Sequence, residues 1–216
     1  MESSRSEVGL IPVKIVVAGG FGVGKTTFVG AISEIEPLRS EAIITEAGAG
    51  IDELLADSNK TRTTVAMDFG RISLNNGLVL YLFGTPGQER FHFMWNELAR
   101  GAIGAVVLAD TRRIEACFPA IDFFEQRETP FVVAINTFDG MRMHDIEEVR
   151  AALTLQPDVP VMYCDARVRY DVHKALVAVA EHALSKARGV VTASDDETPE
   201  DPVDRAESTT TASWAS

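Results

Sequence analysis

A glycine-rich segment near the N-terminus constrains the fold of this chain more than any other feature. Residues 19–26 read Gly-Gly-Phe-Gly-Val-Gly-Lys-Thr, which matches the pattern G-x-x-x-x-G-K-[ST] in full. The apolar residues 13–18 before it are typical of a buried strand, and residues 27–32 after it can begin a helix. In such a loop, successive backbone N–H groups and the positive end of the helix face an anion. The segment therefore predicts a strand, a loop and a helix that bind the phosphates of a nucleoside triphosphate.

Each position of this loop has an expected role. Lys25 is expected to reach the outer phosphates with its ammonium group, and the Thr26 hydroxyl is expected to ligate Mg²⁺. The remaining residues expected to line the nucleotide are Gly19, Gly20, Phe21, Gly22, Val23, Gly24 and Thr27. The alternative is a glycine-rich turn that binds nothing, and the flanking strand and helix make it the weaker interpretation.

Composition fits one globular domain with a tail. Apolar residues make up 46 % of the 216 residues, and no apolar run approaches the roughly 20 residues that cross a bilayer. The formal net charge of −12 argues against nucleic acid or an anionic membrane as the main partner. We expect a polar arm over 1–11, a nucleotide-binding domain over 12–188 and a disordered acidic tail over 189–216. Two cysteines, Cys117 and Cys164, are too few for a disulfide framework and favour a cytoplasmic setting.

Strands and helices alternate beyond the first helix. The expected strands are 13–18, 64–74, 78–83, 103–109, 131–135 and 160–163, and the later expected helices are 113–128, 145–155 and 170–188. An Asn-Gly turn at 75–77 joins two strands into a hairpin, whereas 37–62 is expected to be a long surface segment with one helical turn near 51–55. The pattern predicts an α/β P-loop NTPase fold: a mostly parallel six-stranded sheet with one antiparallel strand and helices on both faces.

Polar residues after the strand at 131–135 suggest which base is bound. Ligands of such sheets bind beyond the carboxyl ends of the strands. Asp139 can accept hydrogen bonds from N1–H and the 2-amino group of guanine, a pair that adenine lacks, with Asn136 bracing the loop. Ala166 would donate its N–H to the guanine oxygen beside the stem of Arg167. The alternative is an ordinary polar loop with an Asp-Gly turn.

The segment Gly-Thr-Pro-Gly-Gln at 84–88 follows another strand. Gly87 is expected to offer its N–H to the γ-phosphate, and Gln88 to orient an attacking water. The alternative is a plain Pro-Gly turn. The residues just beyond are either the buried face of a helix or a surface that changes with the nucleotide; they are Phe91, Phe93, Met94 and Trp95.

Taken together, these segments resemble a small Ras-like GTPase over about residues 12–187. Thr64 resembles the switch I threonine, which places it among the nucleotide and Mg²⁺ contacts; 84–88 resembles switch II, 136–139 the guanine motif and 164–167 the last motif. Within the superfamily the chain is most similar to the bacterial MglA-like branch, and closest to the conservon GTPases known as CvnD.

That resemblance implies a GTP-binding molecular switch that hydrolyses GTP slowly to GDP and phosphate. It also implies a roadblock-domain regulator of the MglB kind, a histidine-kinase system, and a cytoplasmic protein that a partner could recruit to the membrane. One alternative is a nucleotide-dependent adaptor that binds GTP or GDP with little or no hydrolysis. A weaker one is a P-loop ATPase or kinase, which leaves Asn136 and Asp139 unexplained.

Three positions depart from the Ras pattern. Gly84 stands where switch II usually opens with an aspartate that holds Mg²⁺ through a water, Phe21 replaces a frequent glycine, and Thr137 replaces a lysine. Because side chains alternate along a strand, Asp68 shares a face with Thr64, beside the strand that ends at Gly84. We expect Asp68 to support the water shell of Mg²⁺ in place of the missing aspartate; the alternative is a solvated carboxylate on an outer strand.

An arginine near the oxygen that joins the β- and γ-phosphates would neutralise the negative charge that develops there during hydrolysis. This effect raises the rate by about 10³- to 10⁵-fold. Arg62, two residues before Thr64, is the best candidate in this chain, and Arg90 is the next. The alternative for Arg62 is a solvated side chain on a surface loop.

Overall fold

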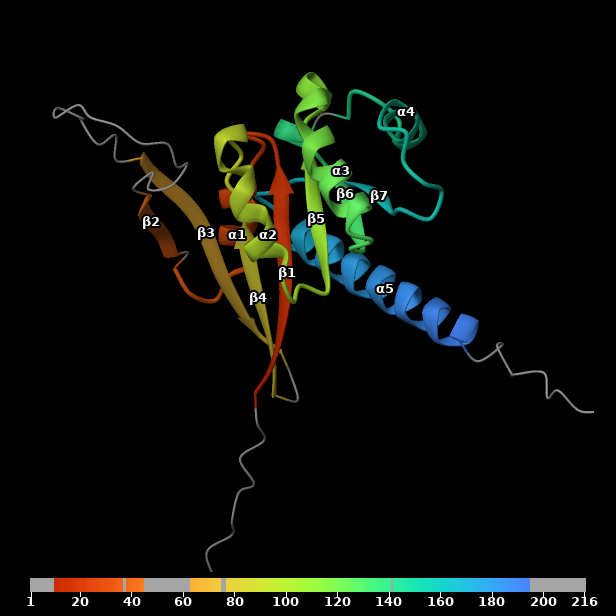
Figure 1. Cartoon of the computed structure of the whole chain (residues 1–216). Coiled ribbons are helices and arrows are strands. Elements are labelled where there is room, and N and C mark those ends of the chain that lie inside the picture. The colour runs from red at the N-terminus through yellow and green to blue at the C-terminus, as the bar shows by residue number, and fades with distance from the viewer. Residues whose placement is uncertain (1–9, 37, 45–62, 75–76, 141, 195–216) are drawn as a thin grey trace, which may run out of the picture.

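A seven-stranded sheet runs through the middle of the molecule in the order β2-β3-β4-β1-β5-β6-β7 (Figure 1). The computed structural model describes residues 10–36, 38–44, 63–74, 77–140 and 142–194. The strands are β1 (Ile11–Gly19), β2 (Leu38–Ile44), β3 (Thr63–Ser73), β4 (Leu78–Gly84), β5 (Gly104–Ala109), β6 (Phe131–Asn136) and β7 (Val161–Cys164). Strand β3 pairs antiparallel with both of its neighbours, and every other pairing is parallel. The prediction of a mostly parallel sheet with one antiparallel strand is confirmed.

The sheet has one strand more than predicted. Strand β2 lies within the segment 37–62 that was expected to be a surface loop, and it pairs along the outer edge of β3 from Ile44 opposite Thr63 to Leu38 opposite Phe69. Its residues show little alternation, because an edge strand takes its hydrogen bonds from its neighbour and needs no strong side-chain pattern of its own. The helical turn expected near 51–55 lies outside the described residues.

Helices cover both faces of the sheet (Figure 1). One core cluster packs α1 (Lys25–Ile32) and α5 (Arg169–Ser194) against the sheet, and a second packs α2 (Trp95–Ala99), α3 (Phe118–Gln126) and α4 (Ile146–Ala152) against the other face. Every residue of β5 and β6 is buried, as expected for central strands of a parallel sheet. Cys117 and Cys164 lie in these cores, and burial raises the pKa of each thiol to about 12, which fits a structural role.

Two predicted helices differ from the observed ones. The predicted helix 113–128 divides into a 3-10 segment, η3 (Thr111–Cys117), and α3, and Arg113 within η3 has non-helical dihedral angles of φ −148° and ψ 57°. The last helix runs to Ser194, so residues 189–194, expected to begin the disordered tail, are helical. None of the described helices combines the length and apolarity needed to cross a bilayer.

Candidate nucleotide site

The loops that carry the predicted site residues lie along one edge of the sheet. Strands β1, β4, β5, β6 and β7 run in the same direction, so their carboxyl ends share that edge. Arg62 lies outside the described residues, and so does the side chain of Thr64, of which only the place in β3 is described. The remaining predicted residues can be located.

Lys25 is buried inside the loop that joins β1 to α1. Only 8 % of it is exposed, and its Nζ donates to the carbonyl oxygens of Gly19 at 2.8 Å and Gly20 at 2.7 Å. Burial lowers the pKa of Lys25 to about 8, against a smaller raising effect of the Asp68 carboxylate. A desolvated ammonium group gains from an anion placed beside it, so the loop is poised to bind phosphate.

Thr26 and Asp68 meet across 42 residues of sequence. The Thr26 Oγ1 donates to the Asp68 Oδ2 at 2.7 Å, and Asp68 is only 9 % exposed. This places the carboxylate of β3 beside the first turn of α1, as strand alternation predicted. A hydroxyl and a carboxylate side by side are oxygen donors of the kind that Mg²⁺ binds, directly or through water. These two residues therefore fit the predicted metal site.

The register of β3 and β4 explains the glycine at position 84. Asp68 lies directly opposite Gly84 in the antiparallel pair. A Cβ atom at Gly84 would lie 3.0 Å from the Asp68 Cβ and 3.1 Å from its Oδ2. An aspartate at position 84 would crowd Asp68 and set two carboxylates against each other. The site therefore has room for one of the two carboxylates, and this chain carries it on β3.

The segment after β4 lies against the phosphate loop. A Cβ atom at Gly87 would be 2.7 Å from the Lys25 Nζ and 2.9 Å from the backbone nitrogen of Phe21. The Trp95 Nε1 donates to the Pro86 oxygen at 3.1 Å and anchors this segment to α2. Gly87 is thus close to the phosphate loop, and its expected N–H contact with a γ-phosphate stays a prediction.

Gln88 and Arg90 contact each other rather than the loop. The Arg90 Nε donates to the Gln88 Oε1 at 2.9 Å, and the guanidinium group lies 4.7 Å from the centre of the Phe91 ring. Gln88 is exposed. In this arrangement the Arg90 guanidinium group occupies one acceptor position of the Gln88 amide oxygen.

The aromatic residues that follow are divided between core and surface. Phe91 and Trp95 are 6 % and 3 % exposed, whereas Phe93 is 61 % exposed. Phe21, in the phosphate loop, is 66 % exposed. Neither sequence interpretation of this segment is sufficient alone, because part of it packs in the core and part of it faces outward.

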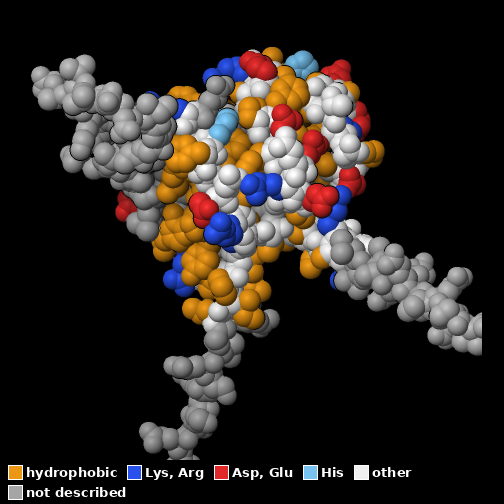
Figure 2. Space-filling view, viewed as in Figure 1, with side chains coloured by type: hydrophobic (Ala, Val, Ile, Leu, Met, Phe, Trp, Pro, Cys, Tyr) orange, Lys and Arg blue, Asp and Glu red, His pale blue; other side chains and the backbone are white. Residues whose placement is uncertain are grey.

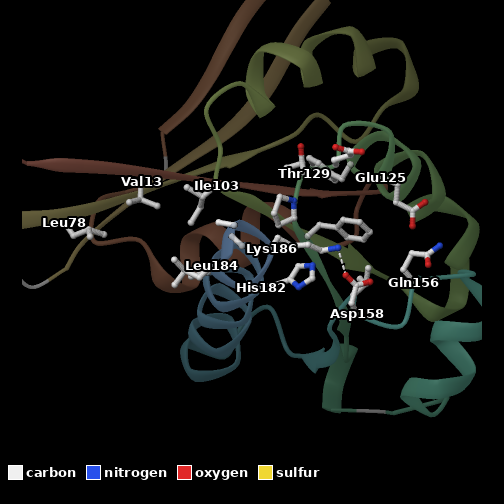
Figure 3. Close-up of a pocket in the computed structure, with 18 residues that line it drawn as sticks. Val13, Leu78, Ile103, Glu125, Thr129, Gln156, Asp158, His182, Leu184 and Lys186 are labelled. Atoms are coloured by element: carbon white, nitrogen blue, oxygen red, sulfur yellow. Dashed lines mark ion pairs between the residues drawn. The ribbon is translucent and has the colours of Figure 1, made fainter. Parts of the chain in front are cut away.

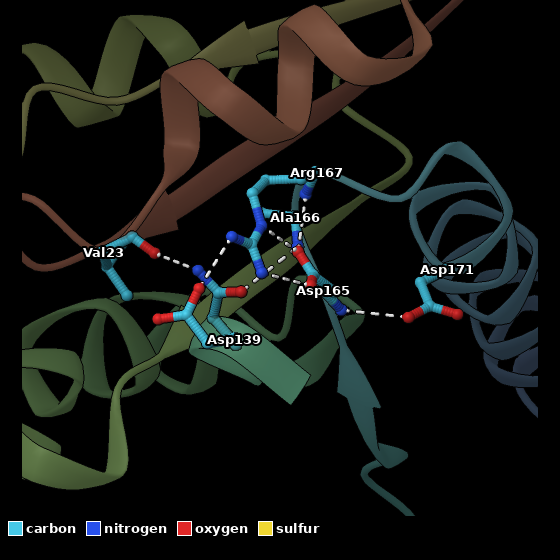
Figure 4. A network of polar contacts seen from close by, with 7 residues as sticks. Val23, Asp139, Asp165, Ala166, Arg167 and Asp171 are labelled. Atoms are coloured by element: carbon cyan, nitrogen blue, oxygen red, sulfur yellow. Dashed lines mark hydrogen bonds and ion pairs between the residues drawn. The ribbon is translucent and has the colours of Figure 1, made fainter. Parts of the chain in front are cut away.

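Asn136 connects three of the predicted segments, and Figure 4 labels two of its partners, Val23 and Ala166. Its Nδ2 donates to the Val23 oxygen at 2.9 Å, and its Oδ1 accepts from the Ala166 N–H at 3.1 Å. The amide is buried, so both bonds replace water that it cannot reach. The bracing role expected for Asn136 has a direct basis, although the Ala166 N–H expected at the guanine oxygen has a protein acceptor here.

Asp139 stands at the exposed end of this network, with its side chain 81 % exposed. Its Oδ1 accepts from the Arg167 Nη1 at 3.0 Å, and Arg167 also holds Asp165 with two bonds of 2.9 and 2.7 Å (Figure 4). The bonds to Asp165 and Asp139 raise the pKa of Arg167. Asp139 and Arg167 therefore lie in contact, and their expected roles beside a base stay predictions.

Two arginines after β5, Arg112 and Arg113, were not among the predicted site residues, whereas Asp110 belongs to a segment expected near the nucleotide. Asp110 is 5 % exposed and accepts two bonds of 2.9 Å from the Arg112 guanidinium, which lies 4.1 Å from the Phe138 ring centre. The hydrogen bond from Arg112 lowers the pKa of Asp110. The Arg113 Nη2 donates to the Phe21 oxygen at 3.2 Å. An aspartate and two arginines directly after a wholly apolar strand were the signal that could have identified them.

A groove lies away from these residues, at the opposite edge of the sheet (Figure 3). Its volume is about 1110 Å³, and its lining includes Val13, Ile103 and Leu184, with an ion pair between Lys186 and Asp158. Figure 2 shows hydrophobic side chains gathered near this end of β1 and the β3–β4 hairpin. Nothing in its lining belongs to the predicted nucleotide site.

Curated proteins that match the chain include Rab GTPases. The chain is 23 % identical to the human Ras-related protein Rab-7b over 191 residues, which cover 84 % of this chain and 87 % of that protein. It is 28 % identical over 130 residues to the uncharacterized protein MJ1339 of Methanocaldococcus jannaschii, covering 59 % of this chain and 71 % of that protein. The Rab-7b match indicates a distant relationship to Ras-like P-loop GTPases.

Solved structures with the same fold include G-domains. The cytosolic domain of the T. maritima FeoB iron transporter in apo form matches with a TM-score of 0.54 at 19 % identity over 80 % of this chain, which spans 64 % of that domain. The FeoB G-domain from Methanococcus jannaschii matches with a TM-score of 0.51 at 15 % identity, covering 79 % of this chain and 99 % of that domain. At these identities the likeness shows the fold, which is that of a G-domain.

A family model describes the chain itself. The model described as "Conserved hypothetical ATP binding protein" matches residues 17–186, from β1 into the last helix. This range includes the phosphate loop, the segment after β4 and the base motif. The chain therefore belongs to the family described as conserved hypothetical ATP binding proteins.

Proposed function

We propose that this protein is a GTP-binding molecular switch that hydrolyses GTP slowly to GDP and phosphate. The observation that carries the proposal is the double hydrogen bond of Asn136, which joins the phosphate loop at Val23 to the base end at Ala166. A ligand that spans this junction presents phosphates to Lys25 and a base to Asp139. The Rab and FeoB relatives support the same class of ligand.

The preference for guanine rests on Asp139. A carboxylate that accepts from two donors of guanine meets no such pair on adenine, and the wrong base leaves the acceptor unpaired. Arg167 holds Asp139 from one side at 3.0 Å, and this orients the carboxylate before a base arrives. The family description mentions ATP, so the base is the first property to measure.

Thr26 and Asp68 would hold Mg²⁺ at the phosphate end, together with Thr64 by resemblance. Bound Mg²⁺ supplies charge neutralisation for the phosphate oxygens. This chain provides two neighbouring oxygen donors, because the Thr26 hydroxyl lies 2.7 Å from the Asp68 carboxylate. Asp68 would support the metal's water shell from β3, in the role that an aspartate after β4 has in Ras-like proteins.

The contact between Gln88 and Arg90 supports the proposal of slow hydrolysis. Gln88 is proposed to orient the attacking water beside Gly87, but its amide oxygen is engaged by Arg90 in the described structure. This bond restricts the conformations of the Gln88 side chain, which would lower the fraction that is competent to orient a water. Arg62 is proposed to supply positive charge to the γ-phosphate, with Arg90 as the second candidate.

A second candidate function is a nucleotide-dependent adaptor with little or no hydrolysis. The contact between Arg90 and Gln88 favours it, and the exposed side chains of Phe21 and Phe93 offer a surface to a partner. By resemblance, we also propose a roadblock-domain regulator of the MglB kind, a histidine-kinase system, a cytoplasmic location and recruitment to the membrane through a partner.

Equilibrium titration of the purified full chain with GTP, GDP and ATP in the presence of Mg²⁺ tests the base. We expect the affinities for GTP and GDP to exceed the affinity for ATP by about 100-fold or more. Equal binding of ATP would contradict the guanine assignment and support an ATPase. Phosphate release under single-turnover conditions then separates the switch from the adaptor, which binds GTP without releasing phosphate.

A further inference from the structure

Arg113 reaches across the sheet edge to the phosphate loop. It lies in η3, and its Nη2 donates to the Phe21 oxygen, 92 residues away in sequence, at 3.2 Å. A Cβ atom at Gly22 would lie 3.7 Å from the same Nη2, so the guanidinium group covers the outer side of the peptide between Phe21 and Gly22. The residue is 53 % exposed, and a contact of this kind is not needed to fill the core.

The peptide that Arg113 contacts is one that can rotate. Gly22 has φ +75°, a conformation that glycine adopts readily, and glycine permits the preceding peptide plane to turn with little cost. In a trans peptide the C=O and the N–H point in opposite directions, and no cis peptide is present among the described residues. A donor that holds the Phe21 carbonyl outward therefore holds the Gly22 N–H inward.

Arg113 is itself held in place. Its Nη2 lies 3.9 Å from the Asp110 Oδ2, and Asp110 is buried and ion-paired with Arg112. The Arg112 guanidinium stacks on Phe138, next to Asp139. One buried carboxylate, Asp110, thus connects the arginine that contacts the phosphate loop with the arginine that contacts the base motif.

We propose that Arg113 is a positioning residue of the phosphate loop. It holds the Phe21 carbonyl so that the Gly22 N–H faces the β-phosphate of a bound nucleotide. Its charge also adds to the positive field on the outer side of the loop. This inference rests on the proposed nucleotide-binding function and names a residue that sequence analysis did not assign to it.

If Arg113 has this role, the affinity lost on its removal should depend on the number of phosphates in the ligand. A residue that orients a phosphate-binding N–H affects ligands with a β-phosphate, whereas a residue that only supports the fold affects all ligands alike. We expect Arg113→Ala to weaken GDP binding by about 10-fold relative to the wild type, with a smaller effect on GMP. Arg113→Lys keeps a charged donor and should restore most of the GDP affinity.

The experiment measures GDP and GMP affinities for four proteins: the wild type, Arg113→Ala, Arg113→Lys and the control Arg100→Ala. Arg100 is also an exposed arginine in an ion pair with a residue three positions away, but it lies before β5, at the other edge of the sheet. In the GDP-bound proteins, hydrogen exchange of the Gly22 amide should be about 10-fold faster in Arg113→Ala. Thermal unfolding without nucleotide checks that the variants fold.

The outcomes separate this proposal from the proposed function. A wild-type protein that binds neither GDP nor GTP overturns both. A wild-type protein that binds GDP, with Arg113→Ala equal to Arg100→Ala, leaves the nucleotide function intact and overturns the role of Arg113. Equal losses for GDP and GMP also overturn it, because they indicate general loosening of the site. A selective loss for GDP with rescue by lysine supports it.

Discussion

The two ends of the candidate site differ in how they hold charge. At the phosphate end Lys25 and Asp68 are 8 % and 9 % exposed, whereas at the base end the Asp139 and Arg167 side chains are 81 % and 54 % exposed. Buried charges have a large cost of desolvation, and exposed pairs are screened by water. Changes at the phosphate end should therefore alter both binding and the stability of the free protein. Changes at the base end should alter ligand choice alone.

The largest expected effect is that of Lys25→Ala. Lys25 is the cation nearest to the proposed phosphates, and we expect its loss to weaken GTP and GDP binding by about 100-fold. Titration of the variant with both nucleotides measures this. Lys174→Ala is a control at an exposed lysine of α5. A Lys25→Ala protein that binds as tightly as this control would contradict the site.

The same lysine predicts a pH dependence of stability. Its pKa in the folded protein is about 8, below the ordinary value of 10.5, so the folded state loses this proton before the unfolded state does. Between these values the unfolded state binds more protons, and the free energy of unfolding should rise with pH. Urea unfolding of nucleotide-free wild type and Lys25→Met at pH 7 and pH 10 tests the sign. From pH 7 to pH 10 the free energy of unfolding of the wild type should rise relative to that of Lys25→Met. The same pH dependence in both proteins would contradict the prediction.

Another effect concerns the strand that carries the carboxylate, which is Asp68 on β3 in this chain rather than a residue at position 84 on β4. Asp68→Ala should speed nucleotide release in Mg²⁺ by about 10-fold, with little change when Mg²⁺ is chelated. Gly84→Asp alone should destabilise the protein, because it crowds Asp68. The double variant Asp68→Gly with Gly84→Asp removes the crowding and should recover part of the Mg²⁺ dependence. If Asp68→Ala releases nucleotide at the wild-type rate, Asp68 has no role at the metal.

The base end should respond more selectively. We expect Asp139→Ala to weaken GTP binding by about 10- to 100-fold and to leave ATP binding unchanged, because only guanine uses the carboxylate. The midpoint of thermal unfolding without nucleotide should stay close to that of the wild type, since the side chain is exposed. A large fall in stability would show that the two ends do not differ as described.

The smallest expected effect concerns Arg90. Arg90→Ala removes the bond that engages Gln88, and the intrinsic rate of GTP hydrolysis should rise by about 2- to 3-fold, within the range of a weak exposed contact. Single-turnover phosphate release measures it. A fall in rate instead would assign Arg90, rather than Arg62, the charge-compensating role.

Much of the site could be predicted because its signals are local. The spacing of glycines, Lys25 and Thr26 specifies a loop between a strand and a helix whatever the rest of the chain does. Strand alternation placed Asp68 on the correct side of β3, since side chains alternate regularly. The edge strand β2 was missed because its hydrogen bonds come from β3 and leave little pattern in its own residues.

By itself, the sequence determined the phosphate loop, the mostly parallel α/β sheet and the group of polar residues beyond its carboxyl ends, because each depends on a short-range period or motif. Only the tertiary structure decided that Asp68 lies opposite Gly84, that Asn136 joins Val23 to Ala166, and that Arg113 reaches Phe21. These contacts depend on strand register and on packing between segments far apart in the chain. No local pattern encodes a distance of that kind, since it results from the folding of the whole sheet.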